Sequence, residues 1–180
     1  MGEYYLRKCL DLLEKATPIK HRDCGKQCLK RCCGGGLNDA VFLFPGEREQ
    51  LSEGSFEFLK TEANYGFDAL LCGGKCNRKH RPLGCRIFPL FPLATEVNDG
   101  IKICVVFDPR AIRICPLSKN TGIISHSFIR SVKRAGEYML LDEEMRNYLL
   151  ALSEELREYA FLDYKLGCSN KKMPIFTVCS

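Results

Sequence analysis

The chain has 180 residues, of which 46% are hydrophobic, and a formal net charge of +5. This is enough apolar sequence for one compact domain, residues 1–180, that needs no disulfide bonds to stay folded. Twelve cysteines are several times the usual number, and they indicate a disulfide framework, metal ligation or catalytic thiol chemistry.

The first twenty residues do not resemble a targeting segment. Charges interrupt the stretch that would be apolar in a signal peptide, at Glu3, Arg7, Lys8, Asp11 and Glu14. No apolar run approaches the length that spans a bilayer, so we expect a cytoplasmic protein with no membrane contact. In that reducing compartment, clustered cysteines favour metal ligation over disulfides.

Apolar residues at helical spacing predict an amphipathic helix over residues 3–15. Cys9 lies on the apolar face of this helix, and we expect it to pack in the core. An all-apolar run over residues 40–44 predicts a buried strand.

A short helix is expected to open at Pro45 and to close at Gly54. Two more strands, around residues 55–60 and 66–72, would then lead into Cys72.

The strongest hairpin pattern lies at residues 93–107, where apolar and polar residues alternate on both sides of an Asn-Asp-Gly turn. Cys104 is out of phase with its apolar neighbours, so it belongs to the other face and packing is its expected role. Asp108 and Pro109 then supply the N-cap and first residue of a short helical segment that ends near Cys115.

Two apolar stripes at helical spacing predict two helices between about residues 125 and 162, which would pack as a hairpin. Nothing in either stripe indicates catalysis. The expected fold is therefore α+β, with a small mixed or antiparallel sheet, a cysteine-rich metal site and a C-terminal helical hairpin.

Most of the cysteines fall in a few short segments between residues 24 and 115. Cys24, Cys28 and Cys32 are four residues apart, a spacing that would place three sulfurs along one face of a helix. Glycines 34–36 follow and let the backbone fold closely around a bound group. We predict one site that collects thiolates from several segments, with the ligands Cys24, Cys28, Cys32, Cys33, Cys72, Cys76, Cys85 and Cys115.

Thiolates are soft ligands, so an iron–sulfur cluster and Zn²⁺ are the candidate cofactors. Zinc ribbons usually present Cys-x₂-Cys knuckles, and this chain has none. The wider spacings, the glycines and the Cys115-Pro116 pair favour an iron–sulfur cluster, with zinc as the alternative. His80 could bind either centre, but its three basic neighbours make a solvated side chain the expected state.

The motifs CGKQCLKRCC, GGKCNRKHRPLGCRIFP and Cys115-Pro116 follow one another between residues 24 and 116. In this order they resemble the YkgJ-like cysteine-cluster family, which is described as a zinc- or iron-chelating domain with a CxxCxxxxC pattern. The RPLGCRIFP stretch is similar to the family's RPxxCRxFP signature residue for residue. The step from Cys24 to Cys28 is one residue longer than in the family, which leaves Cys32 and Cys33 as alternative ligands. The resemblance implies ligation first by Cys24, Cys28, Cys33 and Cys85, then by Cys76, Cys115 and Cys72.

Arg81 and Arg86 bracket Cys85 in the sequence. Guanidinium groups at these positions would offset the negative charge of a thiolate-bound metal without ligating it. The alternative for Arg86 is a solvated surface side chain.

Three classes of function follow. The first is an iron–sulfur protein, redox-active or part of an enzyme of unassigned reaction, since the resembling family includes flagellin lysine methylases; no S-adenosylmethionine loop is recognisable here. The second is a zinc module that binds nucleic acid or an acidic protein through Lys26, Lys30, Arg31, Lys75, Arg78, Lys79 and Arg81. The third is a thiol enzyme, whose base would come from His21, His80 or His126. A redox partner or an acidic macromolecule is the expected partner.

Overall fold

The computed structural model describes residues 2–20, 22–33, 40–51, 68–71, 80–165 and 175–176. The strand expected around residues 55–60 lies outside this part of the chain. So do Cys72, Cys76 and His21, together with the basic residues Lys75, Arg78 and Lys79.

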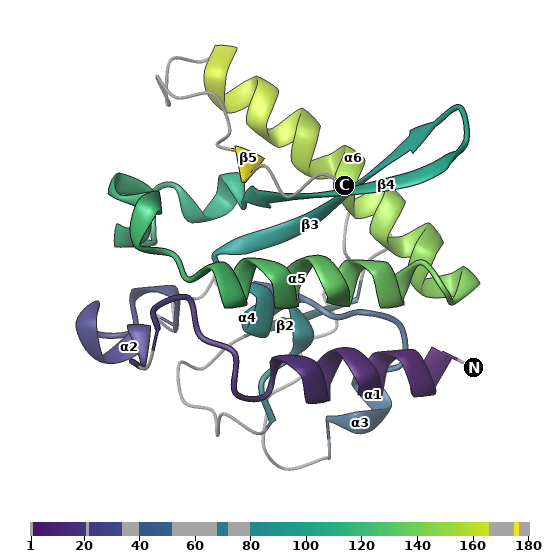
Figure 1. The fold of residues 1–180 in the computed structure, drawn as a ribbon, viewed down its shortest axis with the longest axis horizontal. Coiled ribbons are helices and arrows are strands. Elements are labelled where there is room, and N and C mark those ends of the chain that lie inside the picture. Colours follow the sequence, from purple (N-terminus) through teal and green to yellow (C-terminus); the bar gives the residue numbers. More distant parts are fainter. Residues whose placement is uncertain are drawn as a thin grey trace.

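Helix α1 spans Gly2–Leu13 and confirms the predicted N-terminal helix (Figure 1). Leu6, Cys9 and Leu13 are buried because their spacing places them on one side of the helix. The Cys9 thiol donates to the carbonyl of Ala135 in α5 (His126–Met139) at 3.4 Å. Burial, aided by the charge of Glu47, raises the pKa of Cys9 to about 12. Cys9 is thus a core residue, as predicted.

Strands β3 (Leu90–Val97) and β4 (Gly100–Phe107) form the predicted antiparallel hairpin. Strand β5 (Ile175–Phe176) pairs with the other side of β4, so the sheet order is β3-β4-β5 and β3 is an edge strand. The first five residues of β3 are all buried, which shows that both faces are covered at this end. Cys104 is half-buried and lies opposite Leu93 in the hairpin.

Helices α5 and α6 (Glu143–Lys165) are the predicted C-terminal helical hairpin. Helix α5 packs on one face of the β3–β4 hairpin, where the backbone of Gly136 lies against Pro92 and Ile103. Phe128, Ile129, Val132, Ala135 and Met139 form its buried stripe.

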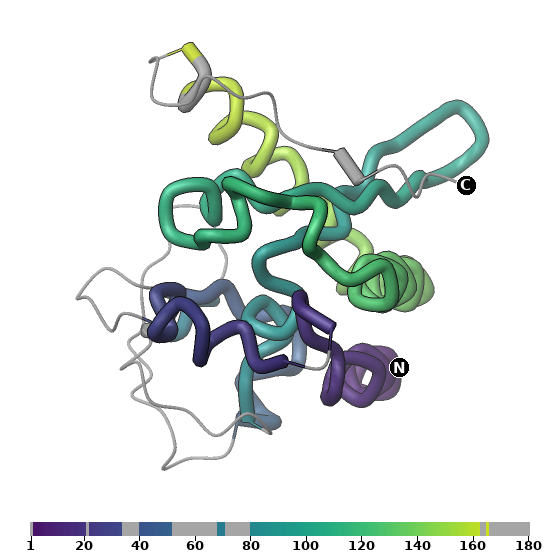
Figure 2. The backbone as a smooth tube through the Cα atoms, turned by 60° about the vertical axis from the view of Figure 1, so that its left-hand side comes forward, coloured from purple at the N-terminus to yellow at the C-terminus, as the bar shows by residue number. Residues whose placement is uncertain are grey.

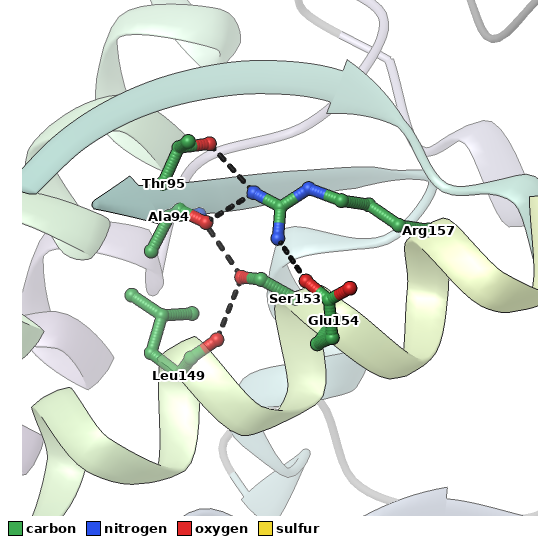
Figure 3. A network of polar contacts seen from close by, with 6 residues as sticks. All are labelled: Ala94, Thr95, Leu149, Ser153, Glu154 and Arg157. Carbon is green, nitrogen blue, oxygen red and sulfur yellow. Dashed lines mark hydrogen bonds and ion pairs between the residues drawn. The ribbon is translucent and has the colours of Figure 1, made fainter. Parts of the chain in front are cut away.

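Helix α6 covers the outer edge of β3 with polar side chains (Figure 3). The Ser153 hydroxyl accepts a hydrogen bond from the Ala94 amide at 2.9 Å and donates to the Leu149 carbonyl at 2.6 Å. Arg157 Nη2 donates to the Ala94 carbonyl and to the Thr95 hydroxyl, both at 2.6 Å. Unpaired backbone groups on an edge strand would otherwise be open to other chains, so α6 protects this edge.

A second, two-stranded antiparallel sheet is formed by β1 (Ala40–Phe42) and β2 (Ala69–Leu71). The predicted helix after Pro45 is present as α3 (Glu47–Gln50), and α4 (Leu83–Ile87) follows later in the chain. Leu43, Leu51 and Leu70 form a small cluster of buried residues beside these elements.

Three short 3₁₀ helices follow β4 and lead the chain to α5. They are η3 (Pro109–Ala111), η4 (Pro116–Lys119) and η5 (Thr121–Ile123). Asp108 caps η3 by accepting from the Arg110 amide at 2.9 Å, which confirms the predicted helical turn. Cys115 stands at the N-cap of η4.

A large shared core joins α1, the hairpin and the C-terminal helices; it includes Leu6, Phe91, Phe107, Phe128 and Leu149. The arrangement of helices and antiparallel sheets is the expected α+β fold. No helix in the described part of the chain combines the length and the apolar character needed to cross a membrane.

Gly136→Ala is expected to destabilise the fold by about 1–3 kcal/mol. A Cβ atom at this position would lie 2.7 Å from Pro92 Cβ and 3.1 Å from Ile103 Cγ2, so helix and hairpin would have to separate. Urea unfolding measures the loss. Gly122→Ala is the control, because its Cβ would meet only Asn120 Oδ1, at 3.5 Å. Equal midpoints for the two variants would contradict the close packing.

Candidate metal centre

Six of the eight predicted ligands line one cavity of about 460 Å³. They come from three segments of the chain and are Cys24, Cys28, Cys32, Cys33, Cys85 and Cys115. The other two, Cys72 and Cys76, lie outside the described residues. The first and last of these segments, residues 22–33 and the stretch after β4, lie at the same end of the molecule in both views (Figures 1 and 2).

The first four cysteines do not share one helix. The expected helical face that would carry Cys24, Cys28 and Cys32 is therefore not formed. Helix α2 covers only Cys24–Gln27, and the 3₁₀ helix η1 covers Arg31–Cys33. Between them Leu29 and Lys30 are left-handed, with φ of 54° and 56°. The Lys30 amide donates to the Gly25 carbonyl at 2.9 Å and closes the turn. This reversal lets Cys32 and Cys33 line the same cavity as the α2 cysteines.

The left-handed turn has an energetic cost. Residues other than glycine are destabilised by roughly 1–2 kcal/mol each in this conformation. Such strain persists only where the surrounding structure enforces it. Two consecutive strained residues, Leu29 and Lys30, therefore mark the loop as held in shape for its cysteines.

Cys32 and Cys33 lie side by side, with their sulfurs 3.9 Å apart. The hydrogen bond from Cys32 lowers the pKa of Cys33 to about 6; the charges of Arg81 and Lys30 also lower it, against burial, which raises it. The same hydrogen bond and burial raise the pKa of Cys32, as do the nearby Cys24 and Cys28. The pair thus favours one thiolate and one thiol, and Cys33 is the better anionic ligand.

Cys115 lines the same cavity from the N-cap of η4. Its amide donates to the Ala111 carbonyl at 2.8 Å, which ties it to the end of η3. Burial raises the pKa of Cys115, and the charges of Cys24 and Cys28 add to this effect. The α2 cysteines are therefore close enough to affect Cys115 electrostatically.

Cys85 is carried by α4, and a buried carboxylate fixes the start of this helix. Glu47 is 1% exposed. It accepts hydrogen bonds from the amides of Phe44, at 2.8 Å, and Leu83. These contacts hold α4 against α3, so Cys85 faces the cavity from a fixed helix.

Arg81 and Arg86 both line the cavity. Arg86 is half-buried, and it donates from Nε to the Arg81 carbonyl and from Nη1 to the Leu10 carbonyl of α1, both at 2.8 Å. It is therefore not a solvated surface arginine. It connects α4 to α1 and places a positive charge beside the thiols.

The histidines do not join this group. His80 and His126 are exposed and do not line the cavity, and His21 lies outside the described residues. Cys9 and Cys104 are likewise absent from the lining.

The apolar IFPLFP stretch that follows Cys85 and Arg86 in the sequence indicates a cover that would keep water from the site, and its Ile87 and Phe91 do line the cavity. Sequence reasoning did not identify two further parts of the site. One is the contribution of β1 to this apolar wall, through Val41 and Phe42. The other is Arg110, which pairs with the buried Asp108 at 2.6 Å and lies over the Phe42 ring. The Asp108-Pro109 pattern indicated a helix cap, and no signal in the sequence pointed to the ion pair.

In the described part of the chain, no three Cys, His, Asp or Glu side chains are grouped closely enough to hold a metal ion. The donor set itself fits a soft metal, because six thiols line the same cavity. Three arginines, Arg81, Arg86 and Arg110, share its walls.

Comparison of the chain with protein-family models, with curated proteins and with solved structures finds no match.

The buried Glu47 carboxyl predicts a specific pH dependence of stability. Burial raises its pKa to about 7, although the amides of Leu83 and Phe44 and the charge of Arg86 lower it. Between about pH 5 and 7 the folded chain holds a proton that the unfolded chain has lost, so the unfolding free energy falls as the pH rises. The expected fall from this group is about 1–3 kcal/mol.

Glu47→Gln is expected to remove this fall while lowering stability overall, since an amide can accept from only one of the two backbone donors. Urea unfolding at several pH values measures both effects. Glu96→Gln, at an exposed position of β3, should keep the slope of the native chain. An equally steep fall in Glu47→Gln would show that another group is responsible.

Proposed function

We propose that this chain is a metal-binding protein whose centre is held by cysteine thiolates, and that the centre is an iron–sulfur cluster. One observation carries the proposal: cysteines from three separate segments line the same cavity. Thiols that serve only packing have no reason to gather at one cavity, and free cysteines usually behave as isolated small apolar residues.

The number of thiols fits either centre, because four cysteines hold a zinc ion and four hold an iron–sulfur cluster. The sequence favours the cluster, since the chain has no Cys-x₂-Cys knuckle and carries a glycine-rich segment and the Cys115-Pro116 pair. Zinc bound by four of the same thiols is the alternative centre, because both metals accept soft thiolate ligands.

The chain's own groups would create a dry and electropositive setting for the metal. Cys24, Cys28, Cys33, Cys85 and Cys115 are the proposed ligands in the described residues, with Cys32 as the alternative to Cys33. The apolar wall would exclude water, and Arg81 and Arg86 would balance the thiolate charge. A bound iron–sulfur cluster supplies one-electron redox chemistry. The reaction and substrate stay unassigned.

The resemblance to the YkgJ-like family supports metal binding at these cysteines. Cys85 stands at the cysteine of the family's RPxxCRxFP signature, and the cysteines that match its CxxCxxxxC pattern lie in the α2 segment. A cytoplasmic location is part of the proposal, since thiols stay reduced there.

Cys85→Ser is expected to lose at least half of the bound metal, because serine replaces a soft thiolate with a weak, neutral ligand. Anaerobic purification followed by iron, zinc and acid-labile sulfide analysis measures the loss per chain. Circular dichroism checks that the variant is folded, and Cys28→Ser repeats the test from another segment.

Cys104→Ser is the matched control, since Cys104 is also half-buried but does not line the cavity. It should keep the metal content of the native chain. Equal metal content in all the variants would contradict the thiolate centre. A colourless protein with stoichiometric zinc would retain the thiolate site and replace the cluster with zinc.

A further inference from the structure

One short segment beside the cavity, residues 20–33, carries a strong positive charge. The whole chain has a net charge of +5. Residues 20–33 hold five cations and one carboxylate, Asp23, and therefore a net charge of 5 − 1 = +4. The cations are Lys20, Arg22, Lys26, Lys30 and Arg31.

The described residues do not neutralise this charge locally. All five cationic residues are exposed, and none forms an ion pair within the described part of the chain. Asp23 accepts from the Gly25 amide at 3.0 Å as the cap of α2. The segment therefore presents a positive field to solvent at the edge of the thiol cavity.

An apolar side chain stands among these cations. Leu29 is 89% exposed, the highest value among the exposed large apolar residues described. Its position is fixed by the left-handed turn and by the Lys30–Gly25 hydrogen bond. Figure 1 shows the α2 segment as a projection at one end of the molecule. A single exposed leucine is ordinary, but here it is held in a strained turn with Lys30 and Arg31 next to it.

We propose that Lys20, Arg22, Lys26, Leu29, Lys30 and Arg31, here termed the α2 surface, form a docking surface for an acidic electron-carrier protein. Electron-transfer complexes have small interfaces, and charge complementarity steers their encounter. The α2 surface is limited to six residues, five of them cationic, and it borders the cavity thiols. The assignment of an electron carrier as the partner rests on the proposed iron–sulfur function.

One electron would pass from the reduced carrier, which is oxidised, to the metal held by the cavity thiols, which is reduced. No atom or group is transferred. Nucleic acid fits the surface less well, because residues 20–33 contain no aromatic side chain on which a base could stack.

The test measures binding of an acidic plant-type [2Fe–2S] ferredoxin to the intact chain by titration calorimetry. The affinity is expected to fall about tenfold or more between roughly 0.02 and 0.2 M salt. The triple variant Lys26→Glu, Lys30→Glu, Arg31→Glu should bind at least about tenfold more weakly than the native chain at low salt. Leu29→Ser should weaken binding without changing its salt dependence.

A second triple variant, Lys8→Glu, Lys102→Glu, Arg134→Glu, changes the net charge equally at exposed positions of α1, β4 and α5. It should bind ferredoxin within about threefold of the native chain. Equal weakening in both triple variants would overturn the proposal, and so would absence of ferredoxin binding to the native chain. Tighter binding of a single-stranded oligonucleotide, lost in the α2 triple variant, would also overturn it in favour of nucleic acid.

Metal analysis of the same preparations separates this proposal from the preceding one. If the native chain binds iron but not ferredoxin, the docking surface is refuted and the metal centre is not. A chain without metal that still binds ferredoxin through the α2 surface would refute the metal centre and keep the surface.

Discussion

The position of Cys85 depends on buried contacts, because the helix that carries it has little stability of its own. Helix α4 has five residues, and such a short helix is not stable alone. It is held by the Arg86 hydrogen bond to Leu10 of α1 and by the hydrogen bond from the Leu83 amide to the buried Glu47. The α2 segment is held by local hydrogen bonds, from the Gly25 amide to Asp23 and from the Lys30 amide to Gly25.

The same arrangement explains why charge matters at this site. Thiols, arginines and an apolar wall share one cavity, and a wall that excludes water strengthens every electrostatic interaction inside it. The opposite pKa shifts of Cys32 and Cys33 arise mainly from the hydrogen bond between their sulfurs, and burial and neighbouring charges modify them. A metal bound there would displace the thiol protons, so that neighbouring sulfurs could bind it as thiolates.

Long periodic elements could be predicted from the sequence, and contact-dependent features could not. Helices α1, α5 and α6 and the β3–β4 hairpin show clear apolar periodicity and a strong turn signal. The interruption of the α2 segment was not predicted, because the left-handed conformation of Leu29 and Lys30 comes from the surrounding fold and not from their intrinsic preferences. The sequence carries no sign that Glu47 is buried, since its partner Leu83 is 36 residues away. Spacing and resemblance alone grouped eight cysteines, six of which line the cavity, and the apolar IFPLFP stretch indicated part of its wall. The contribution of β1 to that wall and the Asp108–Arg110 pair required the structure.

X-ray absorption spectroscopy of anaerobically purified protein at the iron and zinc edges would identify the atoms that bind the metal. For a thiolate-bound cluster we expect a first coordination shell dominated by sulfur at about 2.3 Å, together with iron–iron scattering. A shell of oxygen or nitrogen atoms, or protein without bound metal, would contradict the thiolate centre.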